Sequence, residues 1–171
     1  MHQPGCSATP FRLRNEWWWI GLLFALSLLV RLMYVIPTGF DGLYGQDAYA
    51  YYDFAQVLRE SISAGTPLQP FFWPLGYPAL LAAGFSLFGT APSIGQSINV
   101  LLGSALTALV YVLARQCNLS RSSATVSAVV MMVCGQAVQS SIVVMSDIPA
   151  LFWATLSAVI LLMYVADETV P

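Results

Sequence analysis

The sequence predicts an all-α integral membrane protein with about four transmembrane helices and two interfacial helices in its first outer loop. Hydrophobic residues make up 58% of the 171 residues and charged residues only 8%, whereas a soluble domain carries about 25% charged residues. No charged residue lies between Glu60 and Arg115, and Asp147 is the only one in residues 122–166. Uncharged stretches of this length are typical of transmembrane helices, which need about 20 apolar residues.

The first predicted span covers residues 17–36 and opens with three tryptophans, which are enriched at membrane–water interfaces. Residues 1–16 are expected to form a cytoplasmic N-terminus. Arg31 lies inside the apolar span. Such an arginine either snorkels to the interface or serves a polar site within the protein, and the sequence leaves both interpretations open.

Residues 37–96 are expected to form the outer loop, with two short helices in it. Residues 47–62 repeat apolar side chains at helical spacing, with polar ones on the opposite face, which predicts an amphipathic interfacial helix. Its apolar stripe is Tyr51, Phe54, Ala55, Leu58 and Ile62. Residues 77–89 predict a short apolar helix after a proline-rich stretch. This helix either lies at the interface, our preferred interpretation, or joins residues 71–73 in a tilted span.

Three further spans are predicted at residues 97–114, 124–145 and 148–166, and residues 167–171 are expected to be the end of a truncated chain. Arg115 and Arg121 bracket the turn between the first two of these spans. Arginine-rich turns favour the cytoplasmic side. If the helix at residues 77–89 does not cross the membrane, Arg115 and Arg121 lie on the same side as the N-terminus. If it does cross, they lie on the opposite side. The arginines therefore favour four spans.

This topology places Asp47, Asp53 and Asp147 on the outer face. Asp47 is either an N-cap, which aspartate favours, or a functional carboxylate at an outer cleft. Asp53 fits a solvated helix face. Pro149 suits the first turn of a helix, so either Ser146 or Asp147 is a natural cap. Alternatively, Asp147 marks a functional site, as a lone ionisable group beside transmembrane segments often does.

Aromatic residues gather in the same predicted loop, including Tyr51, Tyr77 and Trp73. They fit either an interfacial aromatic belt or the wall of a sugar or lipid groove. The three cysteines and the one histidine have no metal-ligand spacing. No basic patch indicates a nucleic-acid partner.

Four stretches in this order resemble the N-terminal part of the GT-C superfamily of polytopic glycosyltransferases: "RLMYVIP", "GQDAYAYYDFA", "PFFWPLGYPALLAAGFSLFG" and "VMSDIPALFWATLS". The nearest branch is the family 39-like group, which includes protein O-mannosyltransferases and lipid A aminoarabinose transferase. The resemblance covers roughly residues 22–165.

The resemblance implies an essential acidic residue in the first outer loop, which Asp47 matches, and a second in the next outer loop, which Asp147 matches. It implies a polyprenyl-phosphate sugar as donor and an acceptor on the outer face of the inner membrane of the cell. The partners of the chain would then include membrane lipids. Asp47 would act as general base, with Asp147 as a second catalytic residue. Arg31 would assist the leaving phosphate, and Tyr51 and Tyr77 would contact substrate. No cofactor is certain, and a divalent cation stays open.

Members of that superfamily usually have more spans and often a soluble C-terminal domain, so this chain is expected to be a fragment that is inactive alone. The alternative is a non-enzymatic small membrane subunit or a transporter fragment. A transporter should carry ionisable residues near the membrane midplane, and the last three predicted spans have none.

Overall fold

The computed structural model describes residues 16–68 and 70–168, and in that part of the chain it contains helices and no strand. The helices are α1 (Trp17–Thr38), α2 (Gly45–Ala64), α3 (Gly76–Phe88), α4 (Pro92–Gln116), α5 (Arg121–Val133), α6 (Gly135–Ile142) and α7 (Asp147–Glu168). The predicted all-α membrane class is confirmed.

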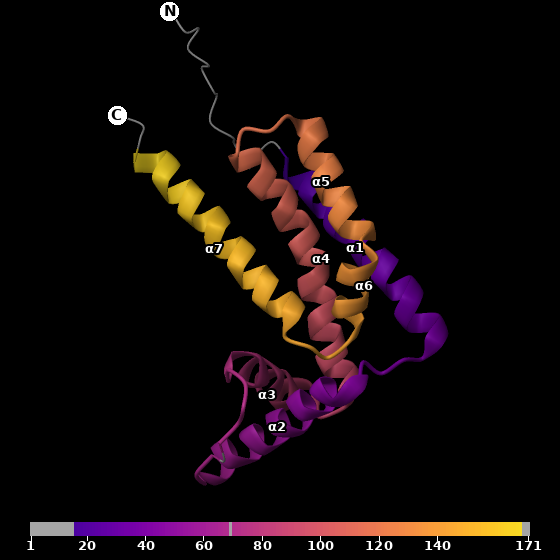
Figure 1. The fold of residues 1–171 in the computed structure, drawn as a ribbon, viewed down its shortest axis with the longest axis vertical. Helices are drawn as coiled ribbons and strands as arrows, with labels where there is room; N and C mark the ends of the chain where they lie inside the picture. The colour runs from indigo at the N-terminus through magenta and orange to yellow at the C-terminus, as the bar shows by residue number, and fades with distance from the viewer. Residues whose placement is uncertain (1–15, 69, 169–171) are drawn as a thin grey trace, which may run out of the picture.

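The central helix of the bundle is α4, which packs against α1, α5, α6 and α7 (Figure 1). By length and composition α1, α4 and α7 can each cross a membrane, and α5 with α6 adds a fourth crossing if the bent pair is one span. Successive crossings alternate in direction along the bundle (Figure 1). The chain is therefore a multi-pass membrane protein with three or four crossings in its described part.

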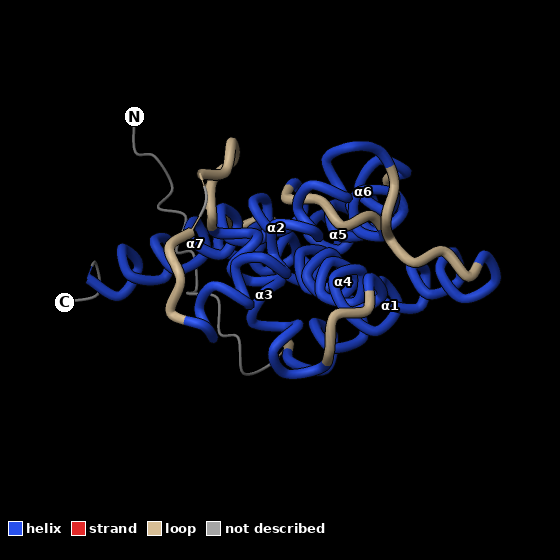
Figure 2. The backbone as a smooth tube through the Cα atoms, turned by 90° about the horizontal axis from the view of Figure 1, so that it is seen from below, coloured by secondary structure: helices blue, strands red, loops and turns tan. Residues whose placement is uncertain are grey.

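The helices α2 and α3 lie across one end of this bundle, side by side (Figures 1 and 2). We name this end the α2–α3 end and the opposite one the Arg115 end. The helix α3 packs mainly on α2 and does not run along the bundle, and it is shorter than the helices that can cross a membrane; its interfacial position stays a prediction.

Two predicted boundaries differ from the structure. The helix predicted at residues 97–114 begins earlier, because Pro92 suits the first turn of α4. The helix predicted at residues 124–145 is interrupted: α5 and α6 meet at Cys134 with a bend of 55°, and they form one span only as a broken pair. Gly135 follows the bend, and glycine is a weak helix former.

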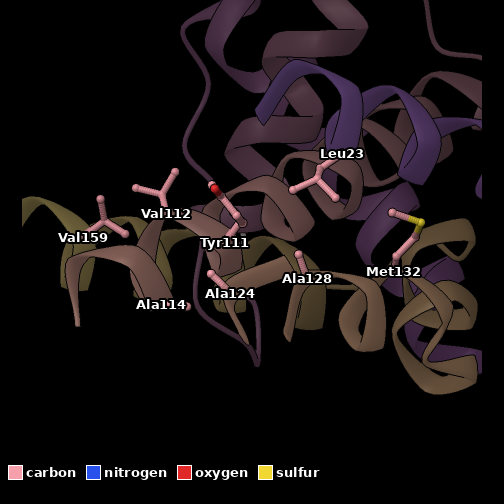
Figure 3. Packing of buried hydrophobic residues seen from close by; sticks show 8 residues of the cluster. All are labelled: Leu23, Tyr111, Val112, Ala114, Ala124, Ala128, Met132 and Val159. Carbon is pink, nitrogen blue, oxygen red and sulfur yellow. The ribbon is translucent and has the colours of Figure 1, made fainter. Parts of the chain in front are cut away.

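Small side chains form the core toward the Arg115 end. Figure 3 shows the residues that pack together there from α1, α4, α5 and α7: Leu23, Tyr111, Val112, Ala114, Ala124, Ala128, Met132 and Val159. Alanines at helix contacts let backbones approach closely, which suits packing within a membrane.

Larger side chains form a second core at the α2–α3 end: Ala48, Tyr51, Ala55, Tyr77, Leu81, Phe85, Val143 and Val144. The predicted stripe of α2 is buried there except for Ile62, which is 70% exposed. Ser61 is buried beside it instead.

Charged contacts tie the helix ends together at the Arg115 end. An oxygen of Glu16, just before α1, lies 3.2 Å from Nη2 of Arg115, near the end of α4. Arg121, the first residue of α5, lies over the rings of Trp18 and Trp19. The arginine turn therefore lies beside the start of α1, as the predicted topology requires. Arg12 and Arg14 lie outside the described residues.

Candidate functional site

Two helices begin with an acidic residue at the α2–α3 end. Asp47 lies in the first turn of α2, and Asp147 is the first residue of α7. Both side chains are exposed. The N-cap of α2 is Tyr44, so the interpretation of Asp47 as an N-cap is wrong. A carboxylate in a first helical turn is favoured by the helix dipole, whatever its further role.

A hydrogen bond joins these two helix starts. The hydroxyl oxygens of Tyr51 and Ser146 lie 3.0 Å apart. Tyr51 stands one turn after Asp47, and Ser146 directly precedes Asp147. The fold therefore brings the two predicted outer loops to one place, although within the described residues the two carboxylates form no hydrogen bond or ion pair with each other.

A buried amide holds the segment that precedes α7. Asn99, fully buried on α4, donates to the carbonyls of Val143 at 2.6 Å and Met145 at 2.8 Å. Its side-chain oxygen accepts a 3.1 Å hydrogen bond from Tyr77. Burial raises the pKa of Tyr77 far above its ordinary value, so its hydroxyl keeps the proton that it donates to Asn99.

A second amide connects the loop after α1 to the same segment. Gln96 donates to the carbonyls of Phe40 at 2.9 Å and Ile142 at 3.0 Å. The backbone N–H of Val144 donates to Gly42 at 2.9 Å. Gly42 has φ +95°, and a Cβ there would lie 2.8 Å from the Cβ of Gln96, so only glycine fits this close approach.

Sequence reasoning missed Gln96, Asn99 and Ser146. A signal for the two amides was available, since they stand three residues apart on one face of an otherwise apolar helix. Polar side chains inside a span usually meet polar partners. No comparable signal marks Ser146, because serine is common at helix starts.

A cavity of about 310 Å³ opens between α3, the first turns of α7 and Tyr51. Its lining comprises Tyr51, Pro74, Gly76, Tyr77, Leu80, Ser146, Pro149, Ala150 and Trp153. The ring of Tyr51 lies 5.1 Å from that of Tyr77 and 5.3 Å from that of Trp73. An apolar cavity with a few converging hydroxyls is typical of a small-molecule site.

The aromatic residues of the outer loop thus divide into two groups. Tyr51 and Tyr77 are each 6% exposed and form part of the cavity wall, whereas Tyr44 and Tyr49 are more than half exposed. Only the second group fits an interfacial belt.

The structure does not place Arg31 beside the carboxylates. Its side chain is fully buried, and its Nη1 donates to the carbonyl of Ser27 at 3.1 Å and to the Ser27 hydroxyl. Among the described residues its Nε and Nη2 have no hydrogen-bond partner. In this conformation Arg31 therefore does not snorkel to the interface, and its expected role at the leaving phosphate stays a prediction. Gly103 makes the burial feasible, because a Cβ there would lie 2.9 Å from the Arg31 Nε.

Metal-ligating side chains do not gather in the described part of the chain, where no group of three or more His, Cys, Asp or Glu residues is found. The divalent cation that the sequence left open stays a prediction.

Comparison with protein families gives one match. The model of the dolichyl-phosphate-mannose-protein mannosyltransferase family matches residues 71–170, which is more than half of the chain. The chain belongs to this mannosyltransferase family. Membership supports a glycosyltransferase-type function in general and confirms the resemblance to a GT-C glycosyltransferase. Comparison with curated proteins and with solved structures gives no match.

The residues of the site divide across the boundary of the mannosyltransferase match. Tyr77, Asn99 and Asp147 lie inside the matched residues, whereas Arg31 and Asp47 precede them. The Tyr51–Ser146 hydrogen bond connects the two parts.

Proposed function

We propose that this mannosyltransferase-family chain takes part in transferring a sugar from a polyprenyl-phosphate donor to an acceptor hydroxyl on the outer face of the membrane. The observation that carries the proposal is the Tyr51–Ser146 hydrogen bond. It joins the helix starts that bear Asp47 and Asp147 beside an aromatic cavity. The family name supports a lipid-linked mannose as donor.

In the proposed reaction Asp47 acts as general base. Its exposed carboxylate accepts the proton of the acceptor hydroxyl, whose oxygen then attacks the anomeric carbon of the donor sugar. The bond from that carbon to the phosphate oxygen breaks, and its electron pair leaves with the polyprenyl phosphate. Attack opposite the leaving group inverts the anomeric configuration.

Other groups of the site would position substrate. Asp147, at the adjoining helix start, would accept hydrogen bonds from sugar hydroxyls. The cavity wall around the sugar would be formed by Tyr51, Tyr77 and Trp153. Arg31 would reach the leaving phosphate only after the helices around it separate, so the proposal gives it no step in this conformation.

The proposed orientation has the N-terminus in the cytoplasm of a cell with the chain in its inner membrane. Arg115 and Arg121 lie together at the end opposite the carboxylates, which supports this orientation through the preference of arginine for the cytoplasmic side.

The test uses membranes that contain the chain and a labelled polyprenyl-phosphate mannose. We expect Asp47→Asn to lower the rate of label transfer by about 10²–10⁴-fold, the usual contribution of a general base. Asp53→Asn, an exposed aspartate on the same helix, is the matched control and should leave transfer unchanged. Both variants should insert normally, as judged by protease protection.

Two results would count against the proposal. Equal rates of transfer by the wild-type chain and by Asp47→Asn would show that Asp47 is not the general base. No transfer by the wild-type chain would exclude catalysis by this chain alone, as both an inactive fragment and the non-enzymatic membrane subunit predict.

A further inference from the structure

A second cavity lies at the Arg115 end, far from the carboxylates. It has a volume of about 490 Å³ between α1 and α5, and its lining comprises Trp18, Trp19, Arg121, Ser122, Thr125 and Val126. The Arg121 guanidinium carbon lies 5.3 Å from the ring of Trp18 and 5.1 Å from that of Trp19. A cation at this distance is attracted to the ring faces, which holds the guanidinium at the cavity.

The hydrogen-bonding capacity of Arg121 is not used within the described residues. No hydrogen bond or ion pair there engages its guanidinium. The nearby Glu16 instead accepts hydrogen bonds from Tyr111 and Arg115. The cavity therefore keeps a positive charge and the five N–H donors of one guanidinium.

The first turn of α5 adds further donors. The Ser120 hydroxyl accepts the N–H of Ser123 at 3.1 Å, and the N–H groups of Arg121 and Ser122 have no intrahelical acceptor. Backbone N–H groups at a helix start bind anions such as phosphate. The Ser122 hydroxyl lies in the same cavity.

The remaining wall is apolar and faces outward. Trp18 is 61% and Val126 62% exposed, and they lie on helices that form the spanning bundle. Tryptophan favours the headgroup level of a membrane. An occupant of this cavity therefore needs an anionic group for Arg121 and a hydrocarbon part for Trp18 and Val126.

We propose that this cavity is a binding site for the headgroup of an anionic phospholipid. The lipid phosphate would accept hydrogen bonds from the Arg121 guanidinium, in the bidentate manner that arginine favours, and from the first turn of α5. The acyl chains would lie along Trp18 and Val126. A headgroup with net negative charge is preferred because basic cavities between transmembrane helices select anionic lipids. The proposal is independent of sugar transfer.

The experiment measures tryptophan quenching by brominated lipids in nanodiscs. The chain carries Trp17→Phe, Trp73→Phe and Trp153→Phe, so that only the two cavity tryptophans emit. Nanodiscs of phosphatidylcholine contain either brominated phosphatidylglycerol or brominated phosphatidylcholine at the same mole fraction. We expect half-maximal quenching at a roughly five-fold lower mole fraction of the anionic lipid, the effect of one arginine at a membrane surface.

Variants separate the site from general surface charge. Arg121→Gln should make the two brominated lipids quench equally. Ser122→Asp should do the same by placing a negative charge in the cavity without touching the arginine. Arg59→Gln, which removes an arginine of the α2–α3 end, should leave the preference unchanged.

The proposal would be overturned by equal quenching in the wild-type cavity, or by a preference that persists in both Arg121→Gln and Ser122→Asp. Inorganic phosphate added to the nanodiscs should not reduce the preference. If it does, the cavity binds free phosphate, and the phospholipid assignment is wrong.

Discussion

The two ends of the bundle are stabilised by different kinds of polar contact. At the α2–α3 end, buried neutral amides bind the carbonyls of irregular backbone, as Asn99 does for Val143 and Met145. At the Arg115 end, charged side chains near the surface join helix ends, as Arg115 does with Glu16. The difference follows from the backbone. A bent, buried segment needs internal partners for its carbonyls, whereas helix ends near water do not.

The comparison predicts that stability is most sensitive at the α2–α3 end. Asn99→Leu removes three hydrogen bonds and leaves two backbone carbonyls and the Tyr77 hydroxyl without their partner. We expect a loss of about 2–4 kcal/mol in the free energy of unfolding, the cost of leaving buried polar groups unsatisfied. The measurement is a denaturant titration in mild detergent, followed by circular dichroism.

Ser97→Ala is the control for the same helix. Ser97 is exposed and bonds only the Ser93 carbonyl within its own helix, so the change should stay within about 0.5 kcal/mol, as for other surface substitutions. If Asn99→Leu costs no more than Ser97→Ala, the segment before α7 is held by something other than this amide, and the contrast between the ends is lost.

A second prediction concerns the buried guanidinium of Arg31, which lies between the two ends. Arg31→Met replaces a buried guanidinium, two of whose nitrogens have no partner, with an apolar side chain of similar length. We expect the free energy of unfolding to stay the same or rise by about 1–3 kcal/mol, because an uncompensated buried charge is costly. Thermal unfolding in detergent gives the comparison.

Arg31→Ala serves as the control for volume. It removes the same charge but leaves a cavity, which should cancel the gain. A clear destabilisation by Arg31→Met would show that the guanidinium is stabilised by more than Ser27. Loss of sugar transfer in a stable Arg31→Met variant would indicate that Arg31 acts on the substrate, as the family resemblance implied.

Much of the fold followed from the sequence because membrane helices are marked by long uncharged stretches. The spans and the amphipathic α2 came from composition and periodicity alone. The break at Cys134 did not, because residues 124–145 contain no charged residue and no proline. Beyond the bend, Gln96 and Asn99 bind the carbonyls of Ile142 and Val143 at the end of α6, and such contacts between helices leave no local pattern.

The candidate site was predictable in part. The arginines led to the prediction that Asp47 and Asp147 share one side of the membrane, and the structure places both at the α2–α3 end; their catalytic roles came from the family resemblance and stay predictions. The burial of Arg31 was not predictable, since it depends on the empty space above Gly103, a residue 72 positions away in the sequence. Whether a polar side chain in a span faces a partner or the surface depends on the opposing helix, which the local sequence does not specify.

The smallest effect is expected at the Arg115 end. Burial alone would raise the pKa of Glu16, but hydrogen bonds from Tyr111 and Arg115 and the nearby positive charges outweigh it and hold this pKa below its usual value of 4.5. Because the folded pKa is lower than the unfolded one, the ion pair stabilises the chain above that usual value and loses its effect as the pH falls through the folded pKa.

Glu16→Gln should therefore cost about 0.5–1 kcal/mol at neutral pH and almost nothing near pH ~3. Glu60→Gln, at a 70% exposed side chain 3.9 Å from Arg59, is the control and should leave stability at neutral pH unchanged. A Glu16→Gln difference that is equal at both pH values would mean that the Arg115 end is held by packing and not by charge.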